Sequence, residues 1–127
     1  MNVDSLDHLV LTVADVTATA AWYERVLGMA VVTFGGGRTA LEFGRQKINL
    51  HRAGQEFEPK ALRPTPGAGD LCFLTAVPLE HVVAHLEAEA VPIEDGPIER
   101  AGGVGPIRSV YVRDPDDNLV EIANSIG

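Results

Sequence analysis

Apolar and polar positions alternate with two different periods along this chain, and the changes of period mark its predicted elements. Residues 6–13 are rich in apolar and β-branched side chains and predict a strand. Between Asp15, a candidate N-cap, and Gly28, a candidate C-cap, apolar residues recur at helical spacing and predict a helix over 16–27. Three more strands are predicted before the first long connector, over 29–34, 38–43 and 46–51.

The second half of the chain repeats this order of elements. A connector over 53–68 contains three prolines and separates the two halves. The elements predicted after it are a strand over 69–75, a helix over 79–90, a strand over 91–99, a loop over 101–105, and strands over 106–113 and 118–123.

Both halves therefore have the order β-α-β-β-β, which predicts an internal duplication. We expect an α+β fold made of two βαβββ modules, 1–52 and 69–127, joined by the connector 53–68 into one domain. The match between the halves depends on element order and apolar pattern, because few residues are identical.

Charge and composition exclude several classes of protein. The formal net charge of −8 argues against non-specific nucleic-acid binding, which uses a basic surface. No apolar run is long enough to cross a membrane, and no export signal is evident at the N-terminus. The single Cys72 cannot form an intrachain disulfide and fits a reducing compartment. We expect a cytoplasmic protein that binds neither nucleic acid nor membrane.

Laying the two halves on each other selects four positions with metal-binding side chains. Residues 8–12 are matched with 70–74, and 49–51 with 119–121, so the selected residues are His8, His51, Asp70 and Glu121. Two imidazoles and two carboxylates suit Mn, Fe, Co, Ni or Zn. For Glu121 alone, the alternative is a carboxylate on the solvent face of an edge strand.

Three motifs carry a resemblance to a known family. They are LDHLVLTV over 6–13, WYERVLGM over 22–29 and DPDDNLVE over 114–121. The chain resembles the vicinal oxygen chelate superfamily, which has the glyoxalase/bleomycin resistance/dioxygenase fold. Through residues 46–51 and 105–111 it is most similar to the small glyoxalase-domain proteins described as virulence proteins.

The resemblance implies paired βαβββ modules that form cup-shaped mixed sheets around one divalent metal. The family's ligand positions map onto His8, His51, Asp70 and Glu121. In glyoxalase I the middle two ligands are commonly a glutamate followed by a histidine or glutamine, whereas here they are His51 and Asp70. Asp70 therefore either ligates the metal or hydrogen-bonds to another ligand and orients it.

The expected function is metal-dependent isomerase or lyase chemistry on a small metabolite with vicinal oxygens. Glu121 is the candidate catalytic proton carrier. Two alternatives are an extradiol dioxygenase using Fe(II) on His8, His51 and Glu121, and a non-catalytic binding protein of the bleomycin-resistance type. The residues expected to contact the substrate are Asn49, Cys72, Tyr111 and Arg113.

A single module supplies only half of a cup and two of the four ligands. Each metal site therefore needs two modules, from one chain or from two. Resemblance to glyoxalase I and the fosfomycin-resistance enzymes, which are dimers with shared sites, favours a homodimer.

Overall fold

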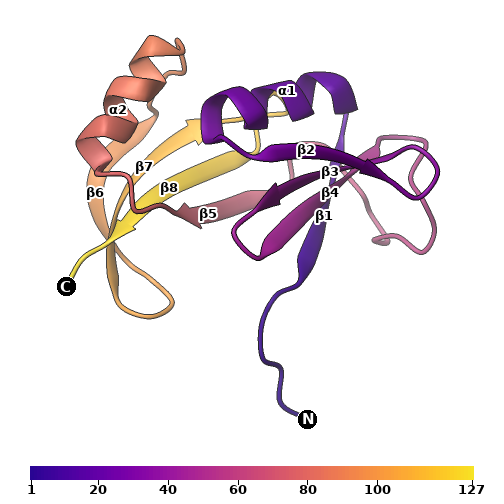
Figure 1. Ribbon diagram of the computed structural model, residues 1–127, viewed down its shortest axis with the longest axis horizontal. Helices are drawn as coiled ribbons and strands as arrows, with labels where there is room; N and C mark the ends of the chain where they lie inside the picture. Colours follow the sequence, from indigo (N-terminus) through magenta and orange to yellow (C-terminus); the bar gives the residue numbers. More distant parts are fainter. The chain divides into compact units, whose positions relative to one another are not determined.

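The computed structural model describes all 127 residues and divides them into two compact units, Met1–Gly67 and Ala68–Gly127 (Figure 1). Each unit contains one helix and one four-stranded mixed sheet, so the predicted α+β class with two βαβββ modules is confirmed. Most of the predicted connector, residues 53–67, belongs to the first unit. None of the helices is both long and apolar enough to span a membrane.

The first unit has the strand order β1-β4-β3-β2 with α1 against the sheet (Figure 1). Strand β1 is parallel to β4, and the other neighbouring pairs are antiparallel. Its elements are β1 (His8–Val13), α1 (Val16–Leu27), β2 (Ala30–Phe34), β3 (Arg38–Phe43) and β4 (Gln46–Arg52).

Helix α1 begins and ends where the sequence predicts. The Asp15 side chain accepts a hydrogen bond from the Ala18 amide, which satisfies one of the free N–H groups of the first turn. Gly28 ends the helix in the left-handed conformation at φ 68°, which a glycine adopts without steric cost. The helix buries Tyr23 and Val26 toward the sheet.

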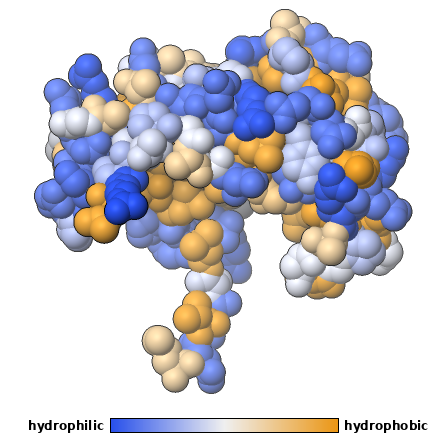
Figure 2. Space-filling view, turned by 180° about the vertical axis from the view of Figure 1, so that it is seen from behind, coloured by the Kyte–Doolittle hydropathy of each residue, from blue (hydrophilic) through white to orange (hydrophobic).

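The residues before β1 have no regular secondary structure. They carry exposed apolar side chains at Met1, Val3 and Leu6, and Figure 2 shows hydrophobic residues along this extended segment. Asp7, the last residue of the segment, contacts His8 at the start of β1. This segment therefore influences the ring orientation of a candidate ligand.

The second unit has the strand order β5-β8-β7-β6 with α2 against β7. Strand β5 is parallel to β8, as β1 is to β4 in the first unit. Its elements are β5 (Asp70–Leu74), α2 (Leu79–Ala88), β6 (Asp95–Ala101), β7 (Pro106–Arg113) and β8 (Leu119–Ser125).

The predicted strand over 91–99 is displaced in the structure. Val91 is buried because it closes the end of α2, where its amide donates to the Leu86 carbonyl after Ala90 turns at φ 56°. Pairing with β7 begins only near Asp95, and the register shifts between Asp95 and Ile98. The apolar side chain of Val91 therefore completes the end of a helix and does not begin a strand.

A hydrogen-bonded turn over 114–118 connects β7 to β8. Asp114, only 4 % exposed, accepts from the Asp116 amide and from both the amide and the side-chain nitrogen of Asn118. The Asn118 side-chain oxygen accepts in turn from the Gly69 amide at 2.7 Å. The turn thereby joins the starts of β5 and β8, the two strands that carry Asp70 and Glu121.

We predict that Asp114→Ala destabilises the protein by about 2–4 kcal/mol, because it removes the acceptor of two buried donors of Asn118 and of the part-buried Asp116 amide. Chemical denaturation measures the loss. Asp117→Gly is the matched control in the same turn, since Asp117 is exposed and has φ 65°, which glycine adopts readily. Equal destabilisation by both variants would contradict this role of Asp114.

Candidate functional site

In the first unit, the register between β1 and β4 determines which candidate ligands are neighbours. His8 is paired with Lys47, Val10 with Asn49, and Thr12 with His51. Because residues rise about 3.3 Å along a strand, His51 lies about 13 Å further along the sheet than His8, and Asn49 about 7 Å. His8 and Asn49 are thus the closer pair on this face.

In the second unit, the register between β5 and β8 gives a two-residue offset. Asp70 is paired with Leu119 and Cys72 with Glu121. The side chains of Asp70 and Glu121 therefore lie on one face of the sheet, two positions apart. In the first unit, Asn49 likewise lies two positions further along the sheet than His8.

These two registers correct the equivalence inferred from the sequence. If His8 is equivalent to Asp70, then Asn49 is equivalent to Glu121, and the equivalent of His51 is Ala123. The predicted match of 49–51 with 119–121 is wrong by two residues, so symmetry selects Asn49 where the sequence pattern selected His51. Alternation along a strand gives the face of each residue, but it does not give the register between two strands.

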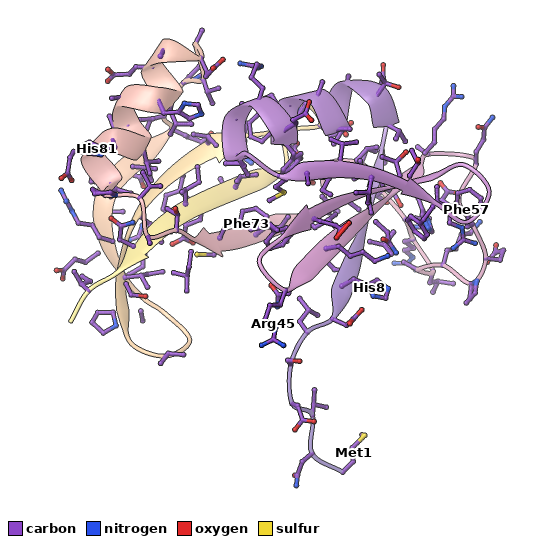
Figure 3. All side chains as sticks on the ribbon, viewed as in Figure 1. Met1, His8, Arg45, Phe57, Phe73 and His81 are labelled. Atoms are coloured by element: carbon purple, nitrogen blue, oxygen red, sulfur yellow. The ribbon has the colours of Figure 1, made fainter.

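The His8 ring lies at the beginning of β1 (Figure 3) and is oriented by its neighbour. Its Nδ1 is 2.7 Å from a carboxylate oxygen of Asp7. A carboxylate on one ring nitrogen leaves the other, Nε2, as the electron-pair donor, an arrangement common around metal-binding histidines. The ring is about two-fifths exposed, so Nε2 can be reached from outside the unit.

Asn49 carries an unsatisfied acceptor. Its side-chain oxygen Oδ1 is buried and has no hydrogen-bond partner in the structure. A buried polar atom without a partner costs free energy, so such atoms in a folded protein call for an explanation. An amide oxygen is a good ligand for a hard divalent cation, and a metal ion in contact with Oδ1 would supply the missing partner.

His51 has a different environment from His8. It is only 7 % exposed and makes an edge-to-face contact with Phe57, which follows β4 in the first unit (Figure 3). Burial, with a smaller contribution from the Arg38 charge, lowers the pKa of His51 below its ordinary value. The ring is therefore neutral near pH 7 and packs on Phe57, as a structural histidine would.

The two carboxylates of the second unit lie beside one hollow. Glu121 accepts a hydrogen bond from the Ser109 hydroxyl at 2.5 Å through Oε2, which fixes the carboxylate, and it also interacts with the neighbouring Cys72 thiol. Asp70 is exposed at the beginning of β5. With Tyr111 and Arg100, both residues line a hollow of about 350 Å³.

Two of the residues predicted to contact substrate, Cys72 and Tyr111, line a larger hollow of the second unit. It has a volume of about 910 Å³, and Glu121 and Arg100 also line it. Burial first, and the neighbouring Glu121 second, raise the pKa of the Cys72 thiol to about 11. The thiol is therefore protonated at neutral pH and is a lining group rather than a nucleophile.

Arg113, also predicted to contact substrate, is engaged elsewhere. Its guanidinium makes a two-point contact with the Glu94 carboxylate at 3.0 and 2.9 Å, and it donates to the Asp117 carbonyl. These contacts hold the end of β7 against the segment before β6. Sequence reasoning instead missed Arg100, since the irregular register of β6 hides which face of that strand an arginine occupies.

Each unit thus carries two ligand-type side chains on one sheet face, His8 with Asn49 in the first and Asp70 with Glu121 in the second. Within either unit, no three or more His, Cys, Asp or Glu side chains gather to hold a metal ion. The chemistry of the four donors fits a divalent cation, because two carboxylates balance its charge and an imidazole and an amide oxygen add neutral ligands.

Comparison with known proteins gives the class to which a chain with these two βαβββ units belongs. The chain belongs to the Glyoxalase/Bleomycin resistance protein/Dioxygenase superfamily, whose family model matches residues 5–122. The chain is 53% identical over 126 residues to Virulence protein STM3117 of Salmonella typhimurium, covering 99% of this chain and 88% of that protein. It is 54% identical over 124 residues to the glyoxalase domain-containing protein RDO1 of Mycosarcoma maydis, covering 98% of this chain and 70% of that protein.

Solved structures agree with this assignment. The crystal structure of Virulence protein STM3117 matches with a TM-score of 0.98, covering 99% of this chain and 100% of that one. Lactoylglutathione lyase from Agrobacterium tumefaciens matches with a TM-score of 0.74 at 26% identity, covering 98% of this chain and 96% of that one. The predicted family and glyoxalase-like fold are therefore confirmed.

Proposed function

We propose that the protein is a metal-dependent enzyme of the glyoxalase type that acts on a small metabolite with vicinal oxygens. His8 and Asn49 of one unit, and Asp70 and Glu121 of another, would hold one divalent ion. The observation that carries this proposal is the buried, unpartnered Oδ1 of Asn49 at the position equivalent to Glu121. The lyase from Agrobacterium tumefaciens supports the class of chemistry.

The donor set suits Mn, Fe, Co, Ni or Zn, and its oxygen-rich character favours the harder of these ions. Four protein donors leave about two of the six positions of an octahedral ion for two substrate oxygens. When bound, the metal would supply Lewis-acid stabilisation of negative charge developing on a substrate oxygen.

Glu121 is the residue we propose to move the proton. The Ser109 hydroxyl holds Oε2, and the carboxylate lines the hollow of the second unit. A carboxylate fixed in this way can accept a proton from a carbon next to a carbonyl and return it to a neighbouring atom. Tyr111 lies opposite Glu121 on the adjacent strand and would hydrogen-bond a substrate oxygen.

We further propose a homodimer in which each metal site takes one pair of donors from each chain. Such an arrangement forms two equivalent sites about a twofold axis. The strand registers give each unit the same two-residue offset between its donors, so two units can complete one site, and the resemblance to dimeric glyoxalase I favours two chains.

The dioxygenase alternative is weaker on the same evidence. It requires two histidines and one carboxylate around Fe(II), and the second histidine would be His51. The register places His51 four positions beyond His8, and the ring packs on Phe57.

Metal analysis tests the proposed function. We expect the isolated protein to contain about one divalent transition metal per chain, to lose it to a chelator, and to recover it from Mn, Co or Ni. Turnover of a candidate substrate should continue without oxygen. Absence of bound metal after reloading would contradict the proposal, and oxygen uptake that requires Fe(II) would favour the dioxygenase.

A further inference from the structure

The hollow of the second unit has two chemically different ends. Its volume of about 910 Å³ lies within the range of pockets that enclose a small ligand. Glu121, Tyr111 and Arg100 form the polar end. Apart from Cys72 and Ser125, the remaining lining is apolar or glycine, from Leu74, the loop 101–105, Pro106, Ile107, Ile126 and Gly127.

The apolar end contains side chains that are exposed to solvent. Leu74 on β5 is 64% exposed, and Val104 at the tip of the β6–β7 loop is fully exposed. The loop keeps a defined shape because the Gly102 amide donates to the Gly105 carbonyl, and a Cβ at Gly102 would lie 2.5 Å from that carbonyl oxygen. An apolar ligand chain placed there would remove this surface from water.

Arg100 is held at the polar end but is only partly satisfied. Its Nε donates to the Tyr111 hydroxyl at 3.0 Å, and Nη1 donates to the Glu99 carbonyl at 3.4 Å. Asp95, at 3.9 Å from Nη2, is beyond hydrogen-bond distance. Of the five guanidinium N–H groups, three therefore have no hydrogen bond in the structure.

We propose that the hollow binds a small monocarboxylic acid with an apolar chain and an oxo or hydroxyl oxygen on the carbon next to the carboxylate. The free N–H groups of Arg100 would bind the carboxylate, and the apolar lining would bind the chain. The vicinal oxygens would reach the metal, which is the part of this inference that rests on the proposed function. Arg100 is thus a specificity-determining residue and not a proton carrier.

The carboxylates next to Arg100 repel an anionic ligand, so their net charge affects how tightly the acid binds. Asp70, Asp95, Glu94 and Glu121 line the adjoining hollow, and the Arg113 contact already balances Glu94. A divalent ion on Asp70 and Glu121 would balance those two carboxylates. Carboxylate binding should therefore be tighter in the metal-loaded protein than after chelation.

Calorimetric titration with 2-oxooctanoate, octanoate, 2-octanone and pyruvate tests the proposal on the full chain, with Mn and after chelation. We expect 2-oxooctanoate to bind most tightly to the Mn-loaded protein. Arg100→Gln should weaken both eight-carbon acids by about tenfold or more and leave 2-octanone and the Mn content unchanged. Leu74→Ser should weaken octanoate and not pyruvate.

Arg108→Gln is the matched control, since Arg108 is exposed on β7 and does not line the hollow. It should leave every titration unchanged. If Arg100→Gln does not alter acid binding, or weakens 2-octanone equally, the assignment of Arg100 is overturned even where Mn binds normally. If the wild-type protein binds no Mn, the proposed function fails. The role of Arg100 is then still decided by comparing the affinities of the metal-free wild type and Arg100→Gln for octanoate and 2-octanone.

Discussion

Replacing Glu121 by alanine is expected to lower the affinity for a divalent transition metal by about 100-fold or more. The change removes one of two charged donors, and loss of even an outer-shell partner costs about 10–100-fold in other metal sites. It also removes the acceptor of the Ser109 hydroxyl. Elemental analysis after gel filtration should find less than stoichiometric metal in this variant.

Glu99→Ala is the control for Glu121→Ala, because Glu99 is an exposed carboxylate on β6 that does not line the hollow of the second unit. It removes the same charge from the chain and should leave the metal content at the wild-type value. Circular dichroism verifies that both variants are folded. Full metal retention by folded Glu121→Ala would contradict the assignment of this residue as a ligand.

Replacing Asn49 by alanine should weaken metal binding by about tenfold or more, whereas His51→Ala should leave it within about twofold of wild type. The reason is the strand register, which makes Asn49 the equivalent of Glu121 and leaves Oδ1 without a protein partner. Titration with Mn monitored by electron paramagnetic resonance gives both affinities.

The free energy of unfolding should show the opposite order, with His51→Ala more destabilising than Asn49→Ala. His51 is buried and packs on Phe57, so its truncation should destabilise the fold by about 1–3 kcal/mol. Asn49→Ala removes an unsatisfied acceptor and should cost less in the metal-free protein. Loss of metal with His51→Ala and retention with Asn49→Ala would restore the ligand set expected from the sequence alone.

Local signals made much of the fold predictable. Helix α1 could be placed to the residue, since Asp15 and Gly28 act within one turn of it, and the order β-α-β-β-β appears twice in the apolar pattern. The apolar pattern predicts β6 too early in the chain, because Val91, which belongs to the end of α2, has the same apolar character as a strand residue. A residue's type does not tell which of two neighbouring elements buries it.

The candidate site was less predictable, since it depends on contacts between distant segments. His8, Asp70 and Glu121 could be recognised as charged or imidazole residues within apolar strands. Asn49 could not be preferred over His51, because only the pairing of β1 with β4 distinguishes them. The sequence also does not show which arginine is available to a substrate. Arg113 is engaged by Glu94, whereas Arg100 donates to Tyr111 and lines the hollow.

The most direct test of the central claim, that two chains share each metal site, is complementation between two defective chains. One chain carries His8→Ala and Asn49→Ala, the other Asp70→Ala and Glu121→Ala, and the two are mixed after unfolding and refolded together. Each variant alone should bind no metal, whereas the isolated heterodimer should bind one ion per two chains. A protein that is monomeric by light scattering, or a heterodimer without metal, would contradict the account.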